Sequence, residues 1–568
     1  SSILTQLGHV QASLGRFDEA HTTLLKSRVL NPANPETHLR LCSVEGKLGR
    51  FNDAIASLDE VMRLRPEMVD ELSTRANLLL DSNRPGDAVK LFQQMLEQDP
   101  TSARCLSGLA RALLALGQWS EALEAFRLAA LLDEEERGYD SNYLYSATLC
   151  PAVHRADSSQ LHLDWGDQIA ASIVPHEHSI GTDSERCLTI GYLSGDFRNH
   201  AVMKFFMPLI RNHSHENFRI YAYSTSPLVD AATEEIRRLS DKWTHCHAMT
   251  TAQLTQQIAD DRVDVLVDLS GHTAGNRLRV FAMRPAPVQV SLLGYPSTSG
   301  LQTMDYRISD FVRENPVSAT YFSELLVDLP GGAICFEMRG ETPDVTTLPL
   351  TECGYVTFGS THRIEKISSH SLQVWAVILQ RQPQARLLVV RDTLSNPQLR
   401  RQLSQRMHAA GIPMDRVDFQ WEFGSSHLSV YSQIDLQLDV FPWGSSTTAL
   451  ESVWMGVPVP TICLPEETAG DAASLLHFMG YPELVARDAD EYVNIVLQLA
   501  TDVQRLAAFR SSARKAMQSA ICDGARYART LESTYRMMWQ RHCGLATDLR
   551  FIHRQSPKIL TPADQTPQ

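Results

Sequence analysis

The chain has 568 residues, of which 43% are hydrophobic and 21% charged, and its formal net charge is −14. This length exceeds what one hydrophobic core supports, so several domains are expected. The negative charge argues against a broad phosphate-binding surface, and therefore against general nucleic-acid binding. The ten cysteines are scattered without a Cys-x-x-Cys pair, so we expect free thiols and a cytoplasmic protein. Because no uncharged apolar run approaches about 18 residues, we expect no membrane span, and the first residues do not predict an export signal.

Residues 1–135 contain a repeat of 34 residues that is already in register at the start of the chain. The repeat is visible in three columns of matching residues: Ala20, Ala54, Ala88 and Ala122; Leu24, Leu58, Phe92 and Phe126; and Pro32, Pro66 and Pro100. Each unit predicts two antiparallel helices that a small residue lets approach closely, and this pattern resembles the tetratricopeptide repeat. We predict about four repeats in a superhelix whose groove holds a protein or peptide; the alternative is a purely structural stack.

Residues 136–186 are predicted to form a helical linker. Their histidines do not have the spacing of a zinc site, and neither does the segment His245-Cys246-His247. No metal site is therefore predicted in either segment.

From residue 187 onward, short apolar runs alternate with amphipathic helices, a pattern typical of parallel sheets covered by helices on both faces. We predict one domain at 187–345 and a second at 346–545, followed by a tail at 546–568. The predicted strands lie at residues 188–193, 219–223, 263–269 and 288–293 in the first domain, and at 355–358, 387–390, 417–419 and 434–439 in the second. The simplest architecture is two Rossmann-like domains that face one cleft, with ligands bound beyond the carboxyl ends of the strands.

A turn rich in Gly, Ser and Thr, residues 444–448, follows the last of these strands and leads into a helix. Free backbone N–H groups, hydroxyl donors and the positive end of the helix dipole suit a diphosphate there, although an ordinary helix cap is the alternative. Glu451 follows one helical turn later, where its carboxylate could accept hydrogen bonds from a ribose diol. The absence of Walker and Gly-x-Gly-x-x-Gly patterns disfavours ATPases and dehydrogenases.

Two side chains in the first domain follow predicted strands. His200 lies just beyond strand 188–193, and histidine can exchange a proton near neutral pH. Asp268 closes strand 263–269 and leads into another turn at the edge of the cleft. Two ordered loops, 284–289 and 293–300, could surround a sugar.

The segments Arg284-Pro-Ala-Pro-Val-Gln289 and Leu293-Gly-Tyr-Pro-Ser-Thr-Ser-Gly300 resemble the O-linked N-acetylglucosamine transferase family. In that family, tetratricopeptide repeats precede a catalytic region of two Rossmann-like lobes, the GT-B type. The resemblance implies inverting transfer of N-acetylglucosamine from UDP-GlcNAc to Ser or Thr of a protein acceptor, with no cofactor and no metal. Asp488-Ala489-Asp490 looks like the start of a helix rather than a manganese site.

The resemblance also implies roles for individual residues. His200 is the cleft histidine, and Lys366 neutralises the departing diphosphate. His200 and Asp268 are candidates for the general base, and a phosphate oxygen or a water relay is a further candidate for removing the proton. The donor site is then expected to comprise His427 on the uracil ring, Ser446, Thr447 and Thr448 at the phosphates, Glu451 at the ribose, and Thr273, Leu293, Gly294, Tyr295 and Pro296 beside the sugar.

Four residues at three places depart from the family's usual ones, namely Gly424 in place of Lys, Ala469-Gly470 in place of Ser-Arg, and Arg363 in place of Asn or Gln. Three alternatives remain open, and the departures at Gly424 and Gly470 bear on the third of them. One is a protein O-fucosyltransferase that uses GDP-fucose, the second is a nucleotide-sugar epimerase, and the third is a repeat scaffold with an inactive catalytic half.

Overall fold

The computed structural model describes residues 1–568 except 66–70, 133–137, 180–182, 423–425, 465–469 and 554–568. Pro66, Gly424, Ala469 and most of the predicted tail therefore lie outside the described residues. The chain forms two compact units, one of residues 1–150 with 393–404 and the other of residues 151–392 with 405–568. No helix in the described ranges is long and apolar enough to cross a membrane.

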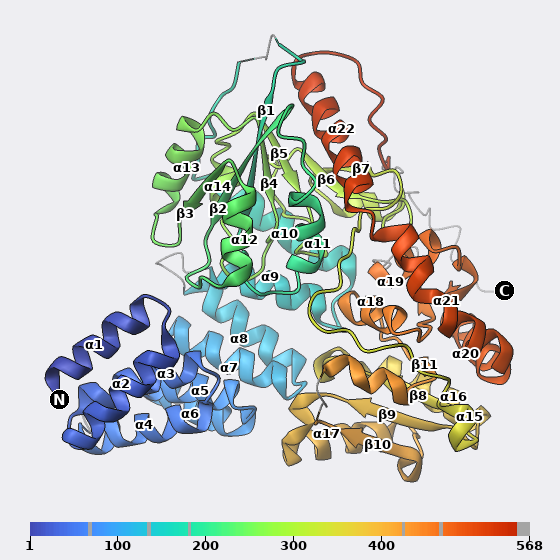
Figure 1. Ribbon diagram of the computed structural model, residues 1–568, viewed down its shortest axis with the longest axis horizontal. Helices are drawn as coiled ribbons and strands as arrows, with labels where there is room; N and C mark the ends of the chain where they lie inside the picture. The colour runs from blue at the N-terminus through green and yellow to red at the C-terminus, as the bar shows by residue number, and fades with distance from the viewer. Residues whose placement is uncertain (66–70, 133–137, 180–182, 423–425, 465–469, 554–568) are drawn as a thin grey trace, which may run out of the picture. The chain divides into compact units, whose positions relative to one another are not determined.

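Paired helices build the first unit, as the 34-residue period predicts (Figure 1). The repeat alanines, such as Ala54 and Ala88, are fully buried between the helices. Gly15, Gly49 and Gly117 connect the helices of a pair with φ of 74°, 72° and 71°, a region that glycine enters without strain. The helices are α1 (Ser2–Ser13), α2 (Phe17–Leu30), α3 (Pro35–Lys47), α4 (Phe51–Leu64), α5 (Glu71–Asp81), α6 (Pro85–Gln98), α7 (Ala103–Ala115), α8 (Trp119–Leu131) and α9 (Tyr139–Leu149).

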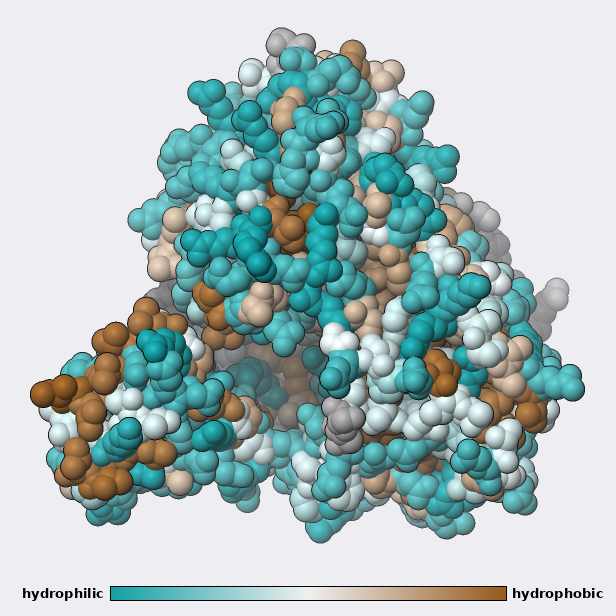
Figure 2. Space-filling model, in the orientation of Figure 1, coloured by the Kyte–Doolittle hydropathy of each residue, from teal (hydrophilic) through white to brown (hydrophobic). Residues whose placement is uncertain are grey.

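Helix α1 exposes an apolar stripe. Ile3, Leu7 and Val10 of this helix, and Leu14 just after it, are between 46% and 85% exposed. They recur at the spacing of one helix face, and Figure 2 shows apolar residues gathered over the first helices.

A seven-stranded parallel sheet forms the first lobe of the second unit, in the order β3-β2-β1-β4-β5-β6-β7. The strands at its centre are fully buried because helices cover both faces. The strands are β1 (Leu188–Ser194), β2 (Phe218–Ser224), β3 (Lys242–His245), β4 (Val265–Asp268), β5 (Val288–Ser291), β6 (Tyr306–Ser309) and β7 (Leu325–Asp328). The helices of this lobe are α10 (Arg155–Ala170), α11 (Met203–Ile210), α12 (Ala231–Leu239), α13 (Thr251–Asp260) and α14 (Leu278–Ala282).

The second lobe has a four-stranded parallel sheet in the order β10-β9-β8-β11. Its strands are β8 (Thr357–Ser360), β9 (Arg386–Val390), β10 (Val417–Gln420) and β11 (Leu436–Gln437), with a separate pair of β12 (Thr461–Ile462) and β13 (Val485–Ala486). Its helices are α15 (Leu350–Cys353), α16 (Ser369–Arg381), α18 (Thr447–Trp454), α19 (Asp471–Phe478), α20 (Ala489–Thr501) and α21 (Val503–Ile521). Helix α17 (Pro397–Ala409) begins among residues 393–404, which are grouped with the first unit, and ends in the second unit. The predicted strands of both lobes are thus present.

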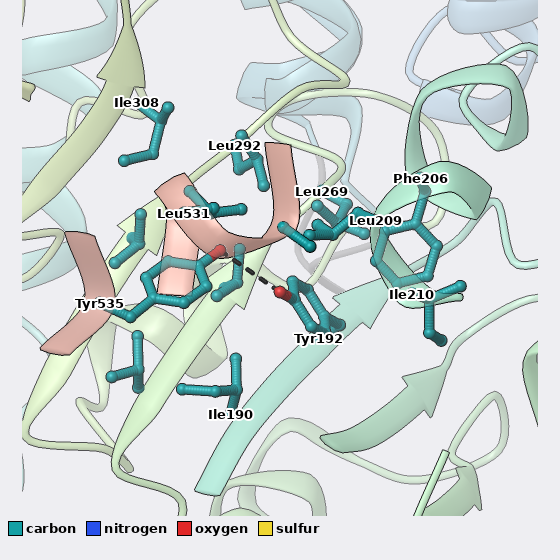
Figure 3. Close-up of a cluster of buried hydrophobic side chains, with 14 of the residues drawn as sticks. Ile190, Tyr192, Phe206, Leu209, Ile210, Leu269, Leu292, Ile308, Leu531 and Tyr535 are labelled. Carbon is teal, nitrogen blue, oxygen red and sulfur yellow. Dashed lines mark hydrogen bonds between the residues drawn. The ribbon is translucent and has the colours of Figure 1, made fainter. Parts of the chain in front are cut away.

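The last helix, α22 (Gly524–His542), packs against the first sheet rather than the second. Leu531 and Tyr535 of α22 share one apolar core with Ile190 and Tyr192 of β1 (Figure 3). The Tyr192 hydroxyl also lies 2.9 Å from Nε2 of His213, a residue of the same lobe. The predicted boundaries placed this helix within 346–545, because sequence order says nothing about which sheet a helix covers.

Candidate active site

A cavity of about 230 Å³ lies between the two lobes of the second unit. His200 follows β1 and Lys366 follows β8, and each of these strands lies where the strand order of its sheet reverses. Ligands of open α/β sheets bind at such switch points, beyond the carboxyl ends of the strands. Eight of the predicted site residues line this cavity, namely His200, Leu293, Gly294, Tyr295, Pro296, Lys366, Ser446 and Thr447.

The turn Leu293–Pro296 forms one wall of the cavity and is rigidly held. Leu293 and Gly294 have φ of 58° and 65°, and a Cβ on Gly294 would lie 2.0 Å from the carbonyl oxygen of Leu269, so only glycine fits. The buried Arg307 donates to the backbone carbonyl oxygen of Tyr295 at 2.5 Å. Backbone groups of this turn are therefore fixed before any ligand binds, which favours recognition of a sugar by preformed contacts.

The Tyr295 side chain is fixed from behind by His162 of α10. Nδ1 of His162 donates to the Ser158 carbonyl oxygen at 2.7 Å, so Nε2 accepts the hydrogen bond from the Tyr295 hydroxyl at 2.6 Å. Burial lowers the pKa of His162 to about 4, which keeps the ring neutral in this arrangement. The segment predicted to be a linker thus supports the cavity wall directly.

His200 is partly exposed at the cavity edge. Its Nδ1 lies 3.5 Å from Oδ2 of Asp196 and accepts a 3.4 Å hydrogen bond from the Val202 N–H. Burial lowers the pKa of His200 below its ordinary value, although Asp196 opposes this shift. The neutral ring that results at pH 7 can accept a proton.

Lys366 lies in the cavity with its ammonium nitrogen 4.0 Å from the centre of the Trp443 ring. Burial lowers the pKa of Lys366 to about 8, and the neighbouring Arg363 acts in the same direction. A cation on an aromatic face in a confined cavity is well placed to meet a phosphate, which would in turn favour its charged form.

The phosphate turn predicted at residues 444–448 is shaped by Asp439, which sequence reasoning did not single out. This fully buried carboxylate accepts hydrogen bonds from the Val440 and Ser445 N–H groups at 2.9 and 3.1 Å, and from the Thr461 hydroxyl at 2.6 Å. Its position directly after a buried strand was the available signal. The turn leads into α18, whose first N–H groups have no partners within the helix and suit an anion.

A second cavity of about 220 Å³ lies beside the start of α18. Thr448 lines it, whereas its neighbour Thr447 lines the first cavity, so the N-terminus of α18 lies between the two. His427 and Glu451 also line the second cavity. This arrangement accommodates a nucleoside in the second cavity, a sugar in the first, and a diphosphate at the helix N-terminus.

Glu451 has two basic partners. Its Oε1 pairs with the Lys204 ammonium group and lies 3.2 Å from Nε2 of His427. Burial alone would raise the pKa of Glu451, but the hydrogen bonds from His427 and Lys204 outweigh burial and lower it. The carboxylate is therefore ionised at neutral pH, as an acceptor for a ribose diol should be.

Two predicted residues do not line either cavity. Asp268 is 1% exposed, and its two oxygens accept hydrogen bonds from the Ser270 and Gly271 N–H groups at 3.0 and 2.8 Å. Burial raises its pKa to about 6. Thr273 donates its hydroxyl to the Ser270 carbonyl oxygen at 2.8 Å. This geometry favours a role for both residues in shaping the turn.

Sequence reasoning also missed Arg313 and Asp471, which line the first cavity from opposite lobes. Neither lies in a recognisable motif.

Within the described ranges, no group of three or more His, Cys, Asp or Glu side chains could hold a metal ion. Asp488 caps α20 by accepting the Glu491 N–H at 2.7 Å, which confirms its prediction as a helix start.

Comparison with known proteins agrees with this architecture. The model of glycosyl transferase family 41 matches residues 156–335 and 347–531, and a tetratricopeptide repeat model matches residues 79–140. The probable UDP-N-acetylglucosamine–peptide N-acetylglucosaminyltransferase SPINDLY of Petunia hybrida is 35% identical over 420 residues, which are 72% of this chain and 45% of that protein. Its namesake from Solanum lycopersicum is 37% identical over 393 residues, 68% of this chain and 42% of that protein.

A solved structure of a Thermobaculum terrenum O-GlcNAc transferase mutant covers 96% of this chain and 98% of its own, with 29% identity and a TM-score of 0.75. The chain spans less than half the length of the curated relatives named above. Because the family model extends over more than half of its residues, the chain belongs to glycosyl transferase family 41.

Proposed function

We propose that the protein is an inverting glycosyltransferase that moves N-acetylglucosamine from UDP-GlcNAc to Ser or Thr hydroxyls of proteins, without a metal. The observation that carries this proposal is the N-terminus of α18, which lies between two cavities with Lys366 at the first of them. The names of the Petunia, tomato and Thermobaculum relatives support the choice of sugar.

The reaction is a single displacement at the anomeric carbon of the sugar. The acceptor oxygen forms the new bond on one face while the bond to the phosphate oxygen breaks on the other, which inverts the anomeric centre. Lys366 and the helix N-terminus stabilise the negative charge that develops on UDP, and preorganised charge of this kind is a large catalytic contribution in a confined site. The hydroxyl proton leaves to a base, for which neutral His200 at the cavity edge is the candidate with the better access.

The helical repeats supply the acceptor site in this proposal. Stacked tetratricopeptide repeats form an extended groove suited to a peptide segment. We place the reaction in the cytoplasm, which suits ten free cysteines.

The proposal is tested by incubating the protein with radiolabelled UDP-GlcNAc and a Ser/Thr-containing peptide, with and without EDTA. We expect label in the peptide in both conditions, and loss of label when Lys366→Ala replaces the parent. Parallel reactions with GDP-fucose and without peptide separate the alternatives. Transfer of fucose alone, or conversion of UDP-GlcNAc without an acceptor, would replace the proposed activity with that of a fucosyltransferase or an epimerase.

A further inference from the structure

Arg313 lines the first cavity, and it lies in an irregular segment between β6 and β7 of the first lobe. This segment is tied to α19 of the second lobe, because the Ser474 hydroxyl donates to Oδ2 of Asp310 at 2.8 Å. Oδ1 of Asp310 in turn accepts the backbone N–H of Arg313 at 3.0 Å. The base of the Arg313 side chain is therefore held in place by hydrogen bonds.

The guanidinium group lies close to the phosphate turn. Its Nη2 lies 3.0 Å from Oδ1 of Asp471, and Oδ2 of Asp471 accepts a hydrogen bond from the hydroxyl of Ser446, the residue just before α18. One carboxylate thus links Arg313 to the helix N-terminus where we expect the diphosphate. The buried Nε–H of Arg313 has no hydrogen-bond partner among the residues that the structure describes, so the group retains an unused donor.

The charges in the cavity leave a role for a second cation. A nucleoside diphosphate carries at least two negative charges, and it gains charge when it leaves the sugar. Lys366 supplies one positive charge, which it loses as the pH rises through its pKa of about 8. Arginine stays protonated, and its planar group can bind two phosphate oxygens at once.

We propose that Arg313 binds the diphosphate of the sugar donor as a second cation beside Lys366, and that Asp471 positions it for this contact. The inference rests on the proposed function, since it requires a nucleoside diphosphate donor. The Asp471 carboxylate pairs with Arg313 and with Ser446, two groups that the phosphates would contact. Binding of the donor therefore adds phosphate oxygens to a cation that is already oriented.

The test compares the affinity of UDP with that of uridine, by calorimetry, for the parent and for Arg313→Gln. Because the two ligands differ only in the diphosphate, we expect the variant to bind UDP at least tenfold more weakly and uridine equally well, in line with loss of a charge-assisted contact. Arg313→Lys retains a charge and should recover part of the loss. If the parent binds GDP more tightly than UDP, the same comparison is made with GDP and guanosine in place of UDP and uridine.

Arg155→Gln is the matched control. Arg155 is likewise partly buried and paired, with its Nη2 2.9 Å from Oε2 of Glu314, but it does not line the cavity. It should leave the affinity for UDP unchanged. Equal affinities of Arg313→Gln and the parent for UDP, or a parallel loss for UDP and uridine, would overturn the role of Arg313 while leaving the proposed function intact. If the parent binds neither UDP nor GDP, both the role of Arg313 and the proposed function are overturned.

Discussion

The ammonium group of Lys204 on α11 and the carboxylate of Glu451 on α18 form an ion pair that joins the two lobes beside the second cavity. The same oxygen of Glu451 also contacts His427. The residue expected to bind the ribose therefore takes part in the contact between lobes, and its charge depends on partners from both of them.

Removal of Lys204 should make nucleotide binding sensitive to mild acid. Burial of Glu451 raises its pKa, and Lys204 is one of the two groups that oppose this effect. In Lys204→Met the pKa of Glu451 should therefore rise, so that its carboxyl group gains a proton at a higher pH than in the parent and loses its ability to accept from a ribose diol. We expect the UDP affinity of the variant to fall by about tenfold on acidification, at a higher pH than any such fall in the parent.

Lys242→Met is the control for this experiment, because Lys242 pairs with Asp261 away from the cavities. Titration of UDP at several pH values gives the affinities. Identical pH profiles for Lys204→Met and the parent would show that Lys204 does not set the charge of Glu451.

Lys366 should impose an alkaline limit on the reaction. The lysine is charged below its pKa of about 8 and neutral above it, so kcat/KM for the donor should fall as the pH rises through that value. Lys366→Ala should reduce kcat/KM by about 100-fold or more at pH 7. Lys366→Arg should move the alkaline limit to higher pH, and an unchanged limit in this variant would assign the titration to another group.

His200 should impose the acid limit if it accepts the proton of the acceptor hydroxyl. Its pKa is lowered by burial, so the neutral form persists below the usual range of histidine and activity should fall only at still lower pH. His200→Ala should reduce kcat by about 100-fold and remove this limb of the profile. A variant that retains the acid limb would point instead to a phosphate oxygen or a water relay.

Asp268→Asn distinguishes a structural carboxylate from a general base. Both oxygens of Asp268 accept backbone N–H groups, and the amide of asparagine would set a donor against one of them. We expect the melting temperature to fall, with an unfolding free energy lower by about 1–3 kcal/mol, and kcat to fall less than in His200→Ala. A large loss of kcat at an unchanged melting temperature would favour the base.

Ala54→Leu tests the packing of the repeats. Ala54 is fully buried between the helices, so a larger residue there should lower the free energy of unfolding of the unit by about 1–3 kcal/mol. Ala56→Leu on the same helix is the control, since residue 56 is exposed. Equal unfolding curves for the two variants would mean that the repeat alanines do not set the distance between helices.

Much of this fold could be predicted because its signals are local. The repeat alanines recur at a fixed period, and strands such as β1 and β4 are apolar runs bounded by turns. The phosphate turn was also visible, because a Gly, Ser and Thr cluster between a strand and a helix has a recognisable composition.

The residues that sequence analysis did not identify are brought to the site by contacts between distant segments of the chain. Arg313 lies in an irregular segment, and only folding brings it to Asp471. Lys204 lies on an apolar helix with no sign that it faces Glu451. His162 was considered only among the linker histidines that lack the spacing of a zinc site, because its partner Tyr295 belongs to another part of the lobe. No local pattern encodes such pairs, so they required the structure.

The position of α22 bears on the order in which the chain can fold. Tyr527, Leu531, Tyr535, Met538 and Trp539 complete a core whose first strand is made more than 300 residues earlier, at Leu188. During synthesis, the part of the first lobe's core that α22 covers therefore stays exposed until the whole second lobe has been made, although α11 and α12 already pack on the same core. Chaperone binding to that part of the core, or aggregation when translation stops before residue 524, is the expected consequence in a cell.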